Sequence, residues 1–184
     1  MLNPELWVEK HGDYLYAYVR YKVPSKEIAE DIVQETFLSA LSSMKHFKGN
    51  SNERTWLISI LKRRIIDYYR KEAKKKERNI SSYKLPFEEE GALKGHWLEN
   101  RAPHSWEPDA EINIDQFHKV LQLCLSILNP KQRLVFIMKI LDESHNDEIC
   151  QEVGISINNL WTIMHRARLQ IRECIEKKGY SNEN

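Results

Sequence analysis

The sequence predicts an all-α protein built from two small helical domains that are joined by a flexible linker. Strand-like alternation of apolar and polar residues is nearly absent from the 184 residues. Apolar residues instead recur at the three- and four-residue spacing of helix faces before residue 79 and after residue 110. The stretch between them holds three of the six prolines, two of the six glycines and no period. We therefore expect a first domain at residues 1–78, a linker at 79–110 and a second domain at 111–184.

The first domain is expected to hold three helices, at residues 4–21, 26–44 and 52–76. Ser25 follows a Val-Pro break and is a suitable N-cap for the second helix. One side of that helix is apolar: Ile28, Ile32, Val33, Phe37 and Leu41. Its other side is acidic and polar: Glu27, Glu30, Asp31, Gln34 and Glu35. The third helix carries an apolar stripe that we expect to be buried: Trp56, Ile60, Leu61, Ile65, Tyr68 and Tyr69.

The second domain is expected to begin with two helices, at residues 110–127 and 131–141. Asn129 and Pro130 between them form an N-cap followed by a proline at the first helical position. The second of these helices is expected to pack its apolar run, residues 134–138, into the core. In the linker, Phe87, Trp97 and Trp106 are aromatic residues able to anchor the segment.

A helix-turn-helix is predicted at residues 144–174. Ile149 and Val153 stand one turn apart, and Gly154 can take the positive φ that ends their helix. Ser156 can cap a second helix, whose apolar stripe is Leu160, Ile163, Met164, Ala167 and Ile171. The outward residues of this helix are candidates for DNA contacts: Ser156, Asn158, Asn159, Trp161, Thr162, His165, Arg166 and Arg168. For this segment taken alone, an ordinary helical hairpin in a bundle is the alternative.

The formal net charge of +1 conceals an uneven distribution along the chain. Residues 62–78 carry nine Lys/Arg against three Asp/Glu, a balance of +6, whereas residues 79–116 have a balance of −5. A basic segment therefore stands beside an acidic one.

The three cysteines, Cys124, Cys150 and Cys174, lie far apart and form no Cys-x-x-Cys or Cys/His cluster. We expect buried free thiols, no metal and a reducing cytoplasm. No apolar run approaches the roughly 20 residues needed to span a bilayer, and the first residues show no signal-peptide pattern.

Two sets of residues resemble one family. Residues 29–37 (AEDIVQETF), 47–49 (FKG) and 55–60 (TWLISI) resemble the second conserved region of bacterial sigma factors. Residues 128–133 (LNPKQR), 148–149 (EI), 154–156 (GIS) and 166–168 (RAR) resemble the fourth. The first and third regions are missing, which is typical of the short extracytoplasmic-function type. The resemblance covers about residues 8–78 and 112–176.

The resemblance implies a dissociable initiation subunit of RNA polymerase that has no cofactor. It implies that Asp31, Gln34 and Glu35, which share a helix face, bind the clamp helices of the polymerase β′ subunit. It implies contacts with the minus-ten promoter element from a loop and the basic helix: Lys48, Gly49, Asn50, Ser51, Lys62, Arg63, Arg64, Arg70 and Lys71. The helix-turn-helix would read the minus-thirty-five element. The implied partners are the β′ and β subunits of core RNA polymerase, promoter DNA and an anti-sigma protein, often membrane-anchored.

The sequence departs from the family pattern at some of these positions. Trp161 stands where lysine is usual, Ile163 where arginine is usual and Arg63 where asparagine is usual. The promoter sequence therefore does not carry over. Because asparagine pairs bidentately with adenine and arginine with guanine, the candidates for base readout are Asn158, Asn159 and Arg166. The role of Trp161 is left open between packing on the sugar-phosphate backbone and binding a regulatory partner.

Two other functions compete with this interpretation. A conventional helix-turn-helix regulator predicts a stable homodimer, palindromic half-sites and no binding to polymerase, and the DIVQETF segment argues against it. A recombinase would need a nucleophile in an arginine cluster, and Tyr68 and Tyr69 beside Arg63, Arg64 and Arg70 come nearest. These tyrosines fall in the apolar stripe, so we expect no enzyme.

Overall fold

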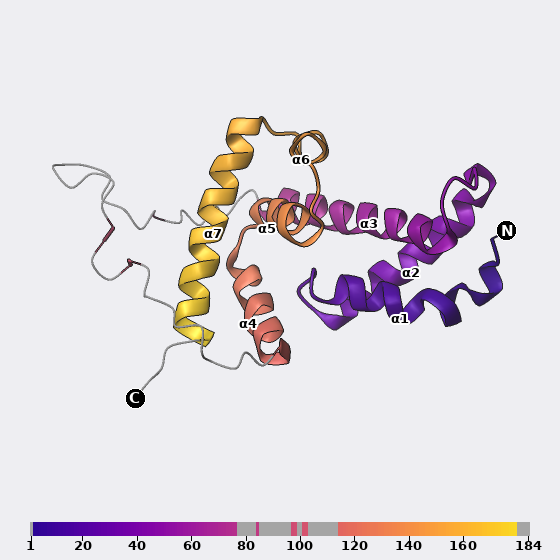
Figure 1. The fold of residues 1–184 in the computed structure, drawn as a ribbon, viewed down its shortest axis with the longest axis horizontal. Helices are drawn as coiled ribbons and strands as arrows, with labels where there is room; N and C mark the ends of the chain where they lie inside the picture. Colours follow the sequence, from indigo (N-terminus) through magenta and orange to yellow (C-terminus); the bar gives the residue numbers. More distant parts are fainter. Residues whose placement is uncertain (1, 77–83, 85–96, 99–100, 103–113, 180–184) are drawn as a thin grey trace. The chain divides into compact units, whose positions relative to one another are not determined.

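The computed structural model describes residues 2–76, 84, 97–98, 101–102 and 114–179 (Figure 1). Every regular element of these residues is a helix, which confirms the all-α prediction. The chain divides into two compact units, Met1–Lys74 (unit 1) and Lys75–Asn184 (unit 2). The linker expected at residues 79–110 lies almost wholly outside the described residues, including Phe87 and Trp106.

Unit 1 is made of α1 (Trp7–Arg20), α2 (Lys26–Ser43) and most of α3 (Glu53–Lys76), with the short 3₁₀ helices η1 (Pro4–Leu6) and η2 (Met44–His46). The predicted cap of α2 is confirmed, because the Ser25 hydroxyl accepts a hydrogen bond from the Ile28 N–H at 3.4 Å. Asn52 starts α3 in the same way, since its side-chain oxygen accepts from the Thr55 N–H at 2.8 Å.

The core of unit 1 contains side chains from all three helices: Trp7, Leu15, Val19, Ala29, Ile32, Val33, Thr36, Ala40, Leu57, Leu61, Ile65 and Tyr69. The placement of Leu41 on the apolar side of α2 is wrong, because its side chain is 48% exposed. Each residue turns a helix by about 100°, so Ala40, seven residues after Val33, faces inward and Leu41 turns out toward the acidic side. The third-helix stripe is buried at Leu61, Ile65 and Tyr69, whereas its other members are half-buried.

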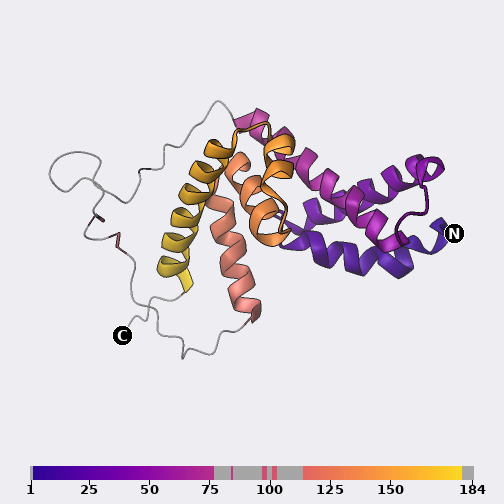
Figure 2. The ribbon, with the colours of Figure 1, turned by 45° about the horizontal axis from the view of Figure 1, so that its top comes forward.

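Unit 2 contains α4 (Ile114–Ile127), α5 (Pro130–Phe136), a π-helical turn η3 (Ile137–Leu141), α6 (Asn146–Val153) and α7 (Ile157–Gly179). The long helix α7 packs against α4, α5 and α6, and Figures 1 and 2 both show α4 alongside it. Residues 133–138 are all buried in this packing, which confirms the predicted core run. The change from α5 to a π turn at Ile137 has no signal in the sequence pattern.

The predicted cap at Asn129 is a full capping box. The Asn129 side chain accepts from the Gln132 N–H at 2.9 Å, and the Gln132 side chain accepts from the Asn129 N–H at 3.2 Å. Pro130 occupies the first helical position, where no N–H is required.

The helix-turn-helix consists of α6 and α7, joined through Gly154. Gly154 has a φ of 67° and its N–H donates to the Cys150 carbonyl at 2.9 Å. An added Cβ would meet nothing within 4 Å, so glycine is favoured there by backbone conformation alone. The Ser156 hydroxyl accepts from the Asn159 N–H at 3.3 Å and caps α7, as predicted.

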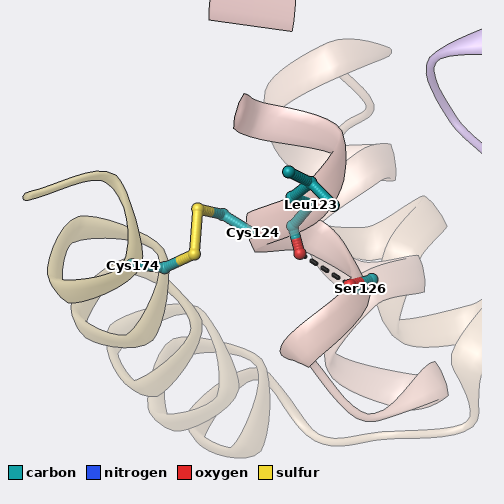
Figure 3. The surroundings of a disulfide bond; sticks show 4 residues. All are labelled: Leu123, Cys124, Ser126 and Cys174. Atoms are coloured by element: carbon teal, nitrogen blue, oxygen red, sulfur yellow. Dashed lines mark hydrogen bonds between the residues drawn. A yellow bond between two sulfur atoms is a disulfide. The ribbon is translucent and has the colours of Figure 1, made fainter. Parts of the chain in front are cut away.

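Two of the cysteines are not free thiols, so that prediction is wrong for them. Cys124 of α4 and Cys174 of α7 form a disulfide, and their Cα atoms are 5.5 Å apart (Figure 3). Cys150 is free and half-buried. The pair was hidden in the sequence because it depends on α4 and α7 packing side by side across a separation of 50 residues.

The described part of the expected linker touches α7 close to this disulfide. Arg101 donates from its Nε and one NH₂ group to the two carboxylate oxygens of Glu173, each at 3.0 Å. Arg172 donates to the Arg101 carbonyl at 2.9 Å, and its guanidinium lies 4.5 Å from the Trp97 ring centroid. We call these contacts the Arg101 clasp.

Candidate nucleic-acid interface

The acidic side of α2 is exposed as the sequence predicts. Asp31, Gln34 and Glu35 all face solvent, and no described residue lies within ion-pair distance of either carboxylate. The same side continues into Leu38, 64% exposed, and Leu41, 48% exposed. We call these residues the α2 face. Its apolar half was missed by the sequence reasoning, although Leu38 stands seven residues after Asp31 and so shares its side of the helix.

A short loop between η2 and α3 presents the next candidates. Lys48, Gly49, Asn50 and Ser51 are all exposed, and Gly49 has a φ of 73°. The loop is fixed at both ends, because Asn52 caps α3 and the Phe47 ring lies 5.0 Å from the Trp56 ring centroid. We call residues 48–51 the capture loop.

Glu53, the first residue of α3, holds the end of this loop to the N-terminal segment and was missed by the sequence reasoning. Its carboxylate accepts from the Asn3 N–H at 2.8 Å and from Trp7 Nε1 at 2.5 Å, and it lies 3.0 Å from His11 Nε2. Burial alone would raise the pKa of the Glu53 carboxyl, but these hydrogen bonds and the charge of His11 together lower that pKa below its ordinary value of 4.5. An isolated glutamate at a helix start gives no sequence signal of such contacts.

The basic side of α3 is only partly available to a partner. Arg63 and Lys71 are exposed and make no ion pair with a described residue. Arg64 and Arg70 lie 3.6 and 3.8 Å from the Asp67 carboxylate, which offsets part of their charge. Lys62 is half-buried.

All the residues predicted on the outward side of α7 are exposed to solvent. The exposed side chains are Ser156, Asn158, Asn159, Trp161, Thr162, His165, Arg166 and Arg168. Ile157, which the sequence reasoning did not select, is exposed among them, and Ile163 is half-buried. No Asp or Glu occurs from residue 153 to residue 172, so no carboxylate of α7 opposes these cations until Glu173. We call this surface the α7 face. It suits a polyanion.

The tyrosines weighed as nucleophiles are poorly placed for that role. Tyr69 is buried, and its hydroxyl donates to the Lys22 carbonyl at 2.6 Å. Tyr68 is half-buried with its ring against Tyr69. Among the described residues no group of His, Cys, Asp or Glu has the arrangement of a metal site. None of the described helices combines the length and apolar character that crossing a membrane requires.

A helix-turn-helix with an acid-free, amide-rich face is typical of DNA-binding proteins, and comparison with protein families identifies the class of this chain. Residues 7–75 match the family model for Sigma-70 region 2, and residues 118–171 match the model for Sigma-70, region 4. The chain therefore belongs to the sigma-70 family of RNA polymerase sigma factors. Family membership favours this function over that of a conventional helix-turn-helix regulator.

Relatives are similar over most of their length. A probable RNA polymerase sigma factor of Haemophilus influenzae is 35% identical over 178 residues, which cover 95% of this chain and 90% of that protein. The ECF RNA polymerase sigma factor SigW of Bacillus subtilis is 29% identical over 168 residues, 90% of this chain and 85% of that protein.

Among solved structures, the sigma factor RpoE of Bartonella quintana, in complex with the anti-sigma factor NepR, has a TM-score of 0.50 and 19% identity. The match covers 95% of this chain and 97% of that one. This likeness supports the fold.

Proposed function

We propose that this sigma factor binds core RNA polymerase through the α2 face and promoter DNA through the capture loop, the basic side of α3 and the α7 face. The observation that carries the proposal is that two surfaces of opposite character are exposed on separate units. The α2 face is acidic and apolar, whereas the α7 face has no carboxylate before Glu173. A protein that bound DNA alone would have no use for the first surface.

The α2 face suits a basic partner helix, and we assign it to the clamp helices of the polymerase β′ subunit. Asp31 and Glu35 would pair with cations of that helix, and Gln34 would hydrogen-bond beside them. Leu38 and Leu41 supply the apolar part of the contact. Burying a leucine side chain contributes about 1.5–3 kcal/mol, so these leucines are expected to supply as much affinity as the charges.

Promoter opening is assigned to unit 1. The capture loop offers short polar side chains and a glycine backbone, which allow a flipped base to approach closely. Arg63 and Lys71 would neutralise phosphates beside it, with Lys62, Arg64 and Arg70 as weaker contributors because of their burial or their contact with Asp67. The α7 face reads the upstream element.

The remaining assignments rest on the family. The acidic linker expected at residues 79–110 would enter the positively charged channels of the polymerase, and the chain would be held inactive by an anti-sigma protein. Because its partner polymerase is cytoplasmic, we place its action in the cytoplasm. The chain binds and positions, and the polymerase performs the chemistry.

Run-off transcription with purified core polymerase tests this proposal, on a promoter selected from random DNA by the reconstituted holoenzyme. Asp31→Lys and Leu38→Ala are expected to weaken binding to core polymerase. Glu9→Lys, an exposed charge reversal on α1, is the matched control and should leave binding unchanged. Arg166→Ala should keep polymerase binding and lose transcripts. A wild-type chain that yields no promoter-dependent transcript refutes the proposal.

A further inference from the structure

Two large apolar side chains stand exposed at the beginning of α7, the second helix of the helix-turn-helix. Ile157 is 42% exposed and Trp161 is 49% exposed. They are four residues apart and therefore lie on the same side of the helix. The inward side is complete without them, because Leu160, Met164 and Ala167 are fully buried. Their exposure is therefore not explained by packing within unit 2.

The surroundings of this pair point to one kind of partner. Asn158 and Asn159 are also exposed in the first turn of α7, and their side-chain amides make no hydrogen bond to a described residue. Arg168 stands seven residues after Trp161 and shares its side of the helix, and Arg166 is exposed further round the helix, both within the stretch that lacks Asp and Glu. An apolar pair with amides and cations on the exposed part of the same helix is complementary to a partner that is anionic outside and carries small apolar groups within.

The major groove of A·T-containing DNA presents that combination. Thymine displays its 5-methyl group there, and adenine displays the N6 donor and N7 acceptor that an asparagine amide can contact bidentately. The first residues of a recognition helix are those that reach base edges. A separation of four residues along a helix is about 6 Å, and base pairs rise by about 3.4 Å, so the pair spans one to two base steps.

We propose that Ile157 and Trp161 read thymine 5-methyl groups in the upstream promoter element, with Asn158 and Asn159 contacting the adjacent adenines. The inference rests on the proposed function and deepens it by naming the bases read. The inference assigns an A·T-rich sequence to the promoter positions that face the first two turns of α7. Trp161 is thereby a specificity residue in place of the phosphate contact that a lysine would give.

Replacing thymine by uracil tests this directly, because it removes one methyl group and leaves the base pairing intact. The selected promoter duplex is scanned with single uracils, and the dissociation constant of the reconstituted holoenzyme is measured for each. One or two neighbouring positions are expected to lose affinity by about four-fold, since burial of one methyl contributes about 0.8 kcal/mol and 1.4 kcal/mol is ten-fold.

The variants link those positions to the side chains. With Trp161→Ala or Ile157→Ala the thymine-to-uracil ratio should fall to about one at the corresponding position. Ile140→Ala is the matched control, because Ile140 is 40% exposed in unit 2 but lies on η3. It should keep the four-fold ratio. All these side chains are exposed, so the variants are expected to fold, which circular dichroism checks.

The possible outcomes distinguish the thymine-methyl readout from the proposed function on which it rests. A wild-type holoenzyme that binds the promoter equally well with uracil at every position overturns the methyl readout and leaves the proposed function standing. A Trp161→Ala variant that loses binding to a protein partner but keeps the full thymine preference also overturns the methyl readout and leaves the proposed function standing. A chain that forms no promoter complex with core polymerase overturns both.

Discussion

Reducing the disulfide between Cys124 and Cys174 should selectively destabilise unit 2. The bond closes a loop with a sequence separation of 50 residues that contains α5, η3, α6 and most of α7. Cross-linking a loop of that length lowers the entropy of the unfolded chain and corresponds to about 4 kcal/mol at 25 °C. A small helical core rarely supplies more than about 3–5 kcal/mol, so unit 2 is expected to be marginally folded once the bond is open.

The assay is urea unfolding of the full chain with and without a dithiol reductant, followed by hydrogen exchange and mass spectrometry so that each unit is seen separately. With a slope of about 1–2 kcal/mol per M, the midpoint of unit 2 should fall by about 2–4 M. Unit 1 contains no cysteine and is an internal control whose midpoint should not move.

Two variants test whether the disulfide causes the shift in the unfolding midpoint of unit 2. Cys150→Ser removes the free thiol and should keep the full response to reductant. The double change Cys124→Ala with Cys174→Ala should match the reduced protein and lose the response. A midpoint for unit 2 that shifts by less than about 0.5 M on complete reduction would refute the loop-closure reasoning.

Three further predictions concern single residues. Glu53→Gln should destabilise unit 1 by about 2 kcal/mol, because three donors lose a charged acceptor. Folding lowers the pKa of Glu53 below 4.5, so the stability that its carboxylate contributes is complete above that pH and is lost as the pH falls below it. Acid titration of the variant should not show this loss of stability. Gly154→Ala should cost unit 2 about 1–2 kcal/mol because of the φ of 67°, measured by urea unfolding. Arg63→Ala and Lys71→Ala should each lower the slope of log affinity for promoter DNA against log salt by about 1.

Each of these has a control that isolates its cause. For Glu53, equal acid sensitivity in the variant and the wild type would contradict the role given to the carboxylate. Gly154→Asn should cost less than Gly154→Ala, because asparagine tolerates the left-handed region, and equal costs would argue against backbone strain. Lys10→Ala on α1 is an exposed charge deletion that should leave the salt slope unchanged.

Local signals in the sequence predicted local structure well. The caps at Ser25, Asn129 and Ser156 and the turn at Gly154 each depend on one side chain and its immediate backbone, and all are present. The exposed residues of α7 followed from the 3.6-residue period because its apolar stripe is unambiguous.

Features that depend on neighbours distant in sequence were missed or wrong. Cys124 and Cys174 meet only because two helices pack side by side, and Glu53 finds its donors on the N-terminal segment and α1. Leu41 was placed on the apolar side because α2 carries leucines beyond one face, so periodicity alone did not distinguish a buried leucine from an exposed one. Whether the exposed candidates contact polymerase or DNA is a property of the complex, which the experiments above address.

The Arg101 clasp has a consequence for the C-terminal part of α7. Glu173, which accepts both Arg101 hydrogen bonds, stands next to Cys174, and Arg172 beside it contacts the Arg101 carbonyl and the Trp97 ring. This end of α7 is therefore attached twice, by the disulfide to α4 and by the clasp to Trp97 and Arg101. Reduction of the disulfide removes only one of these attachments, so the clasp remains as a second contact that holds the helix end in place.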